Sequence, residues 1–222
     1  MLVDSFTVSY LPSASVLALL TTQPAALDNV FLGAIGNATA DGTAPLPGTL
    51  QEVSGIAQML PKAVQRLGVG FTHDEARGAL LRYQVVHFAT HGLNEAAPMF
   101  SVLLTAPASG QPARLSLYEL ADLPMKAKLV VLSACETGLG KLSGGDEVSG
   151  LTRTLILAGA NTVVSSLWKV SDDSTALLMR AFYDHLRRGD RPALAMREAA
   201  LEVRRHFSHP FYWAPFVVTG AN

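Results

Sequence analysis

Apolar residues along the chain form continuous runs in some segments and recur every three to four positions in others. Continuous apolar runs predict buried strands, and the helical spacing predicts amphipathic helices. The runs place buried strands at 29–37, 83–92, 127–135 and 161–168, and the spacing places helices at 50–60, 73–82, 146–158, 172–188 and 191–206. The strand at 127–135 is almost wholly apolar, which is typical of a central parallel strand covered on both faces.

The remaining segments carry weaker patterns. Residues 2–10 alternate as a strand would, and 13–22 predict a short helix with a serine at its cap. Residues 99–117 resemble a hairpin around a turn-rich centre, and 214–220 predict a closing edge strand. Strands that alternate with helices predict an α/β fold with a mainly parallel, helix-covered central sheet.

Composition favours a single globular domain and argues against nucleic-acid-binding, membrane and disulfide-rich proteins. The 222 residues are enough for one substantial core, and 49% of them are hydrophobic against 16% charged. A net charge of −1 without charged blocks attracts neither nucleic acid nor anionic membranes. The single cysteine excludes an internal disulfide and favours a reducing, cytoplasmic setting. No apolar run is long enough for a membrane span, and no secretory signal is visible.

The stretch "LSACETGLGKLSGGD" at 132–146 is the main candidate for chemistry. A phosphate-binding loop needs an earlier glycine and a hydroxyl residue after the lysine, but Leu142 follows Gly140-Lys141. The dinucleotide glycine pattern also fails, because Ser143 stands at its third glycine. Nucleotide binding therefore remains only a third hypothesis, supported by Gly140-Lys141 alone.

A zinc site built from Cys135, His87 and His91 is a second possibility. If 83–92 is a strand, His87 and His91 share a face but lie about 13 Å apart. One zinc ion with bonds near 2 Å does not bridge that distance. The sequence therefore predicts no metal site.

A cysteine nucleophile fits the topology better. His91 stands at the carboxyl end of one predicted strand, and Cys135 stands at the carboxyl end of another. Open parallel sheets bind ligands at these ends, so neighbouring strands would bring imidazole and thiol together. An imidazole lowers the pKa of an adjacent thiol and makes it a competent nucleophile. The alternative, an ordinary buried core thiol, stays open at this point.

Several motifs resemble the CHAT domain, a caspase-like family often found behind tetratricopeptide repeats. They are "LPGTLQEVSGIAQMLP", "HFATHG", "LVVLSACETGLG" and "GDEVSGLTRTLILAGANTVVSSLWKVSDDST". The resemblance extends over essentially the whole chain. It implies a caspase-like three-layer sandwich with a mainly parallel central sheet flanked by helices.

The resemblance also implies an activity, that of a cysteine endopeptidase acting on a protein or peptide substrate without a cofactor. His91 would be the general base and Cys135 the nucleophile, with the backbone N–H groups of Gly92 and Cys135 as the oxyanion hole. The alternative is a peptidase-like interaction module whose dyad is idle. His87, deeper in the same strand, is expected to be a structural core residue.

For the substrate pocket, the resemblance implies Ser133, Trp168, Asp172 and Asp173. Metacaspase-like relatives carry an acid two residues before the cysteine to read a basic substrate residue; here that position is Ser133, so this chain cannot use that device. The segment "LWKVSDDS" resembles a separase segment in which an aspartate reads arginine. By this resemblance Asp172 would supply the negative charge that binds the basic residue, and Asp173 would be the alternative to it. Trp168 would form a wall of the pocket. The same two aspartates also fit the cap and first acidic turn of the following helix.

The domain organisation follows from the same resemblance. Residues 1–222 are expected to form one caspase-like domain whose start lies inside the family's domain, without its N-terminal part. A regulatory repeat domain is expected as a partner on that side. Nucleic acid and membrane are not expected as partners.

Overall fold

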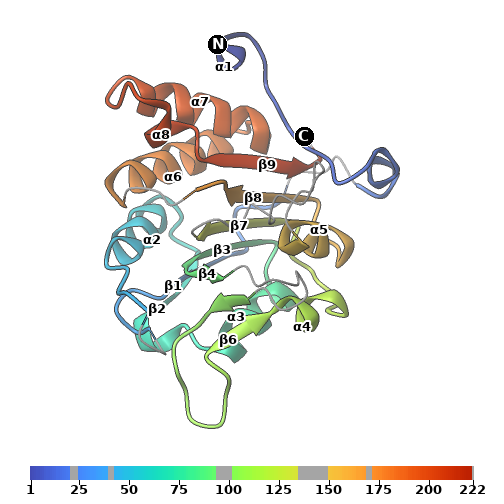
Figure 1. Cartoon of the computed structure of the whole chain (residues 1–222), viewed down its shortest axis with the longest axis vertical. Helices are drawn as coiled ribbons and strands as arrows, with labels where there is room; N and C mark the ends of the chain where they lie inside the picture. The colour runs from blue at the N-terminus through green and yellow to red at the C-terminus, as the bar shows by residue number, and fades with distance from the viewer. Residues whose placement is uncertain (21–24, 40–42, 94–101, 135–149, 169–171, 222) are drawn as a thin grey trace.

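A computed structural model describes the chain except for residues 21–24, 40–42, 94–101, 135–149, 169–171 and 222. Its centre is a six-stranded sheet in the order β2-β1-β3-β7-β8-β9 (Figure 1). The strands are β1 (Val30–Ala34), β2 (Val64–Leu67), β3 (Val85–Thr90), β7 (Leu129–Ala134), β8 (Thr162–Ser166) and β9 (Phe216–Gly220). All neighbours pair in parallel except β9, which is antiparallel to β8 at the edge.

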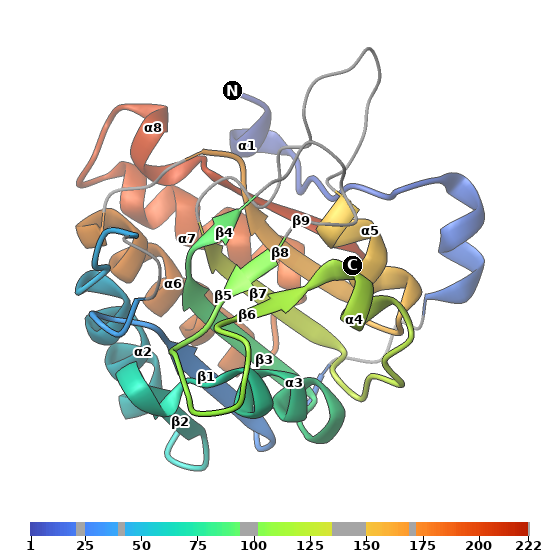
Figure 2. The ribbon, with the colours of Figure 1, turned by 60° about the horizontal axis from the view of Figure 1, so that its bottom comes forward.

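Helices cover both faces of this sheet and make three layers, as Figures 1 and 2 show. One face is covered by α2 (Gly48–Met59), α6 (Asp172–Arg187) and α7 (Pro192–Arg204). The other carries α3 (His73–Arg82), α4 (Leu117–Ala121) and α5 (Gly150–Leu157). A small antiparallel sheet of β4 (Gly92–Leu93), β5 (Val102–Leu104) and β6 (Arg114–Ser116) lies on the second side. The predicted three-layer α/β fold is therefore confirmed.

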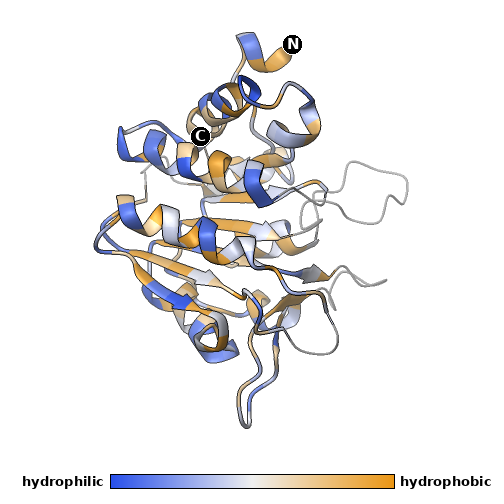
Figure 3. Ribbon diagram, turned by 90° about the vertical axis from the view of Figure 1, so that its left-hand side faces the viewer, coloured by the Kyte–Doolittle hydropathy of each residue, from blue (hydrophilic) through white to orange (hydrophobic). Residues whose placement is uncertain are grey.

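Apolar residues concentrate on the central strands and on the helix faces turned toward them (Figure 3). Every residue of β1, β3, β7 and β8 is buried, as the continuous apolar runs indicated. On α2, the apolar residues Val53 and Ile56, which follow the helical spacing, are completely buried. Among the described residues, no helix is both long and apolar enough to cross a membrane.

The first ten residues differ from the sequence prediction. They do not form a strand: Leu2–Ser5 is a short helix, α1, and only Tyr10 reaches the sheet, through a single bridge to Thr219 of β9. Phe6 and Val8 are exposed, so their alternation has no buried face to fill. The segment at 13–22 contains the short 3-10 helix Ala14–Leu19; Ser13 stands at its N-cap, but its side chain accepts no capping hydrogen bond.

Candidate active site

The carboxyl ends of β3 and β7 lie side by side. The two strands pair in parallel, and Thr90, the last residue of β3, stands opposite Ala134, the last residue of β7. His91 and Cys135 are the next residues in the sequence. The predicted adjacency of the two strands is thus confirmed. Cys135 lies outside the described residues, so its predicted separation from His91 stays a prediction.

The ring of His91 is oriented by a backbone carbonyl. Its Nε2 lies 2.7 Å from the carbonyl oxygen of Ala44, in the loop that leads into α2. A carbonyl oxygen only accepts, so Nε2 carries the ring proton and donates it to Ala44. In the neutral ring, Nδ1 then keeps its lone pair, and this is the tautomer that a general base needs. The sequence offered no signal for Ala44, because a backbone carbonyl has no side-chain signature.

Side chains hold the end of β7 from both sides. Ser133 donates a hydrogen bond of 3.0 Å from its hydroxyl to Oε2 of Glu52 on α2. Ser166, the last residue of β8, donates from its hydroxyl to the carbonyl oxygen of Ala134. These contacts fix the backbone immediately before the candidate nucleophile. Ser133 is buried, and its described contact is with Glu52.

The predicted oxyanion hole is only partly described. Gly92 is the first residue of β4 and stands opposite Leu103 of β5. The neighbouring carbonyl of His91 accepts a hydrogen bond of 2.9 Å from the backbone N–H of Leu104. The small sheet therefore fixes the backbone around His91 and Gly92. The second donor, the N–H of Cys135, lies outside the described residues.

Trp168 follows β8 and is anchored toward α8 (Pro210–Trp213). Its indole N–H donates a hydrogen bond of 3.0 Å to the carbonyl of Phe211. The two rings are stacked, with centroids 6.5 Å apart and planes 21° apart. These contacts give Trp168 a structural role, and its predicted role as a pocket wall stays a prediction.

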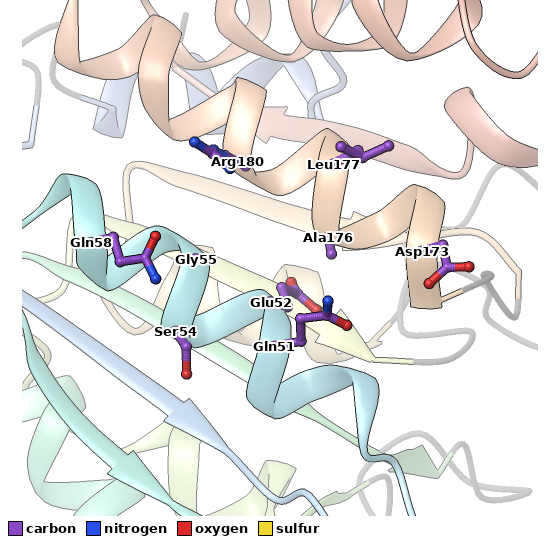
Figure 4. Close-up of a pocket in the computed structure, with 9 residues that line it drawn as sticks. All are labelled: Gln51, Glu52, Ser54, Gly55, Gln58, Asp173, Ala176, Leu177 and Arg180. Carbon is purple, nitrogen blue, oxygen red and sulfur yellow. The ribbon is translucent and has the colours of Figure 1, made fainter.

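Asp172 and Asp173 form the first acidic turn of α6, and both are exposed. The carboxyl group of Asp172 lies against Gly48 at the start of α2, where an added Cβ would come within 2.3 Å of Cγ. Asp173 lines a groove of about 460 Å³ between α2 and α6 (Figure 4). The starts of the two helices therefore meet at the same edge of the sheet that His91 occupies.

A buried polar cluster lies below this edge. His87 on β3 is completely buried, which confirms its predicted core position. Its Nε2 lies 3.0 Å from Oε1 of Glu52, and its Nδ1 lies 3.3 Å from the hydroxyl of Tyr183 on α6. Glu52 is only 5% exposed. Its place one helical turn before Ile56 on the 50–60 helix was the available sequence signal for a buried carboxylate.

Among the described residues, no group of three or more histidine, cysteine, aspartate or glutamate side chains is placed to hold a metal ion. Cys135 of the discounted zinc site and Gly140-Lys141 of the discounted phosphate loop lie outside the described residues.

Comparison with known proteins gives one family over nearly the whole chain. The CHAT domain profile matches residues 1–221. Human tetratricopeptide repeat protein 28 is 27% identical over 217 residues, covering 80% of this chain and 8% of that protein. The mouse protein of the same name is 26% identical, with 80% of this chain and 9% of that protein covered. The chain thus spans less than a tenth of the length of these relatives.

Solved structures share the fold at low sequence identity. The Saccharomyces cerevisiae separase–securin complex superposes with a TM-score of 0.70 at 16% identity, covering 98% of this chain and 14% of that chain. The Arg-specific cysteine proteinase gingipain R gives 0.63 at 12% identity, covering 93% and 50%. The Drosophila initiator caspase Dronc gives 0.53 at 9% identity, covering 92% and 85%. At these identities the likeness establishes a caspase-like fold and no more.

Proposed function

Because the chain belongs to the CHAT domain family, we propose that it is a cysteine endopeptidase whose dyad is His91 and Cys135. The observation that carries this proposal is the His91 ring, which donates from Nε2 to the Ala44 carbonyl and so keeps the lone pair on Nδ1, at the end of the strand beside β7. The caspase-like fold supports a hydrolase of this class. The substrate would be a protein or peptide.

The chemistry would proceed through an acyl-enzyme. Nδ1 of His91 accepts the thiol proton of Cys135, and the thiolate attacks the peptide carbonyl. The backbone N–H groups of Gly92 and Cys135 stabilise the oxyanion. His91 then returns the proton to the leaving amine, and water hydrolyses the thioester with His91 again as the base.

A protein-interaction module with an idle dyad is the second candidate. The relatives are named for tetratricopeptide repeats, and this chain covers only 8–9% of their length. The domain would then act as one part of a larger assembly. In either case we propose a repeat domain as the regulatory partner.

A peptide probe with a thiol-reactive group separates the two candidates. The wild type should be acylated and should cleave peptides, whereas Cys135→Ala should abolish both. His91→Ala should lower acylation by about 10²–10⁴-fold, because the general base is lost. Lys141→Ala is the control and should change little. Equal labelling of the wild type and the His91 variant would favour the idle module.

A further inference from the structure

One buried carboxylate, that of Glu52, contacts both strands that lead to the candidate dyad. Its Oε2 accepts the hydrogen bond from Ser133 of β7 at 3.0 Å, and its Oε1 lies 3.0 Å from Nε2 of His87 on β3. Neither Oε1 nor that Nε2 has a well-aligned hydrogen bond among the described residues. Glu52 points into the space between α2 and α6 (Figure 4).

Tyr183 extends this cluster to α6. Burial, and then the negative charge of Glu52, raise the Tyr183 pKa well above 10, so its hydroxyl keeps its proton. That proton is available to Nδ1 of His87, 3.3 Å away. A Tyr183 hydroxyl that donates to Nδ1 leaves the ring proton of His87 on Nε2, which lies 3.0 Å from Oε1 of Glu52.

The four elements joined by this cluster are those that carry the candidate site. Strand β3 leads to His91, and Ser133 of β7 stands two residues before Cys135. Helix α2 follows the loop of Ala44, whose carbonyl orients His91. Helix α6 begins with the aspartates proposed to read the substrate.

Stability alone does not account for such a cluster. Removing one partner of a buried charged group is costly, but replacing the whole set by apolar side chains of similar size is often neutral or stabilising. In several proteins a buried polar cluster imposes one geometry on the elements that it joins. Such a constraint matters most at an active site, where a misplacement of about 1 Å can cost about 10²-fold in rate.

We propose that Glu52 is a positioning residue, which sets the relative position of the His91 and Cys135 strand ends through Ser133 and His87. The proposal rests on the proposed dyad function. Ser133 thereby acts through Glu52 and the backbone of β7, and not by contact with substrate.

The test uses three single variants of the whole chain. Ser133→Ala removes the link to β7 at almost constant volume. Glu52→Gln keeps the size of the side chain, but its amide cannot accept from both Ser133 and His87 through two oxygens. Ser165→Ala is the matched control, because Ser165 on β8 is equally buried and its hydroxyl has no hydrogen-bond partner among the described residues.

Two measurements are made on each variant. The first is the rate of iodoacetamide alkylation at pH 6, which reports Cys135 alone because it is the chain's one cysteine. An ordinary thiol of pKa near 8.5 is less than about 1% thiolate at that pH, so fast alkylation reports a thiol paired with a base. The second is kcat and KM for a cleaved peptide.

We expect fast alkylation of the wild type, and rates about tenfold slower for Ser133→Ala and Glu52→Gln. Their kcat should fall about tenfold with KM within about twofold, and the double variant should lose no more than either single one. Ser165→Ala should match the wild type in both measurements. Fast alkylation that depends on Glu52 without any peptide cleavage would refute the peptidase function and leave the positioning role standing.

Three results would overturn the positioning role. The first is wild-type alkylation and kcat in folded Ser133→Ala and Glu52→Gln. The second is a raised KM at constant kcat in Ser133→Ala, which would show substrate contact instead. The third is a wild-type Cys135 that reacts only as fast as an ordinary thiol.

Discussion

At the scale of single residues, His185 shows how paired carboxylates can make a histidine pH-sensitive. Its Nδ1 lies 2.7 Å from Oδ2 of Asp190, and its Nε2 lies 3.0 Å from Oε1 of Glu202. Burial by itself lowers the pKa of His185, but the hydrogen bonds to Asp190 and Glu202 outweigh it and raise the pKa above 6.5. Both ring nitrogens donate only when the ring is charged, so protonation completes the arrangement.

The raised pKa predicts how His185 contributes to stability. Its contribution is complete below the unfolded pKa of 6.5 and is lost as pH rises through the folded pKa. His185→Gln should therefore lower Tm by about 3–8 °C at pH 5.5, the scale of one or two charge-assisted hydrogen bonds. The deficit should shrink steadily toward pH 9 in thermal melts. Exposed His206→Gln is the control, and a deficit independent of pH would contradict the prediction.

Side-chain chemistry and strand position together made His91 a candidate general base in the sequence, whereas the group that orients its ring was not predictable. Ala44 acts through its carbonyl, which every residue possesses, so only the folded loop reveals it. Glu52 is an intermediate case, because it stands one helical turn before the apolar Ile56, but this spacing does not reveal its contacts with Ser133 and His87.

At the scale of elements, the end of β9 depends on a glycine. Gly220 has φ +118°, and a Cβ there would lie 2.1 Å from the carbonyl oxygen of Asn161. Both the backbone conformation and the close approach exclude a side chain. Gly110 offers a matched position, with φ +72° but no atom within 4 Å of an added Cβ.

Substitutions at Gly220 and Gly110 separate the cost of backbone strain from the cost of a steric clash. Gly220→Ala should reduce the free energy of unfolding by about 2–4 kcal/mol, from strain and overpacking together. Gly110→Ala should cost about 1–2 kcal/mol, from strain alone. Urea denaturation of both variants checks the difference. Equal losses would mean that β9 can shift away from Asn161 without cost.

Long apolar or amphipathic elements were predictable, and short or exposed ones were not. β3, β7 and α6 have patterns that burial imposes on every residue or every turn. The sequence pattern did not predict β2, because this strand has only four residues at the sheet edge and only alternate side chains are partly buried. The strand predicted at 2–10 was wrong, because the alternating residues there are mostly exposed to solvent.

At the scale of the whole molecule, parallel topology gathers the candidate groups at one edge. Helices that follow parallel strands begin at the carboxyl edge, so the starts of α2 and α6 meet beside the ends of β3 and β7. The contact of Asp172 with Gly48 and the place of Asp173 in the groove follow from that meeting. Two carboxylates at the edge would make it acidic toward an approaching peptide.

This arrangement predicts a preference for a basic residue before the scissile bond. If Asp172 reads that residue, peptides with Arg or Lys there should be cleaved fastest in a panel that varies this position. Asp172→Asn should then reduce the preference by about 2–3 kcal/mol, or roughly 30–150-fold, the strength of a charge-assisted hydrogen bond. Asp122→Asn, at an exposed position after α4, is the charge-matched control and should leave the preference unchanged. A preference for an apolar or acidic residue would leave Asp172 and Asp173 as first-turn residues that stabilise the start of α6.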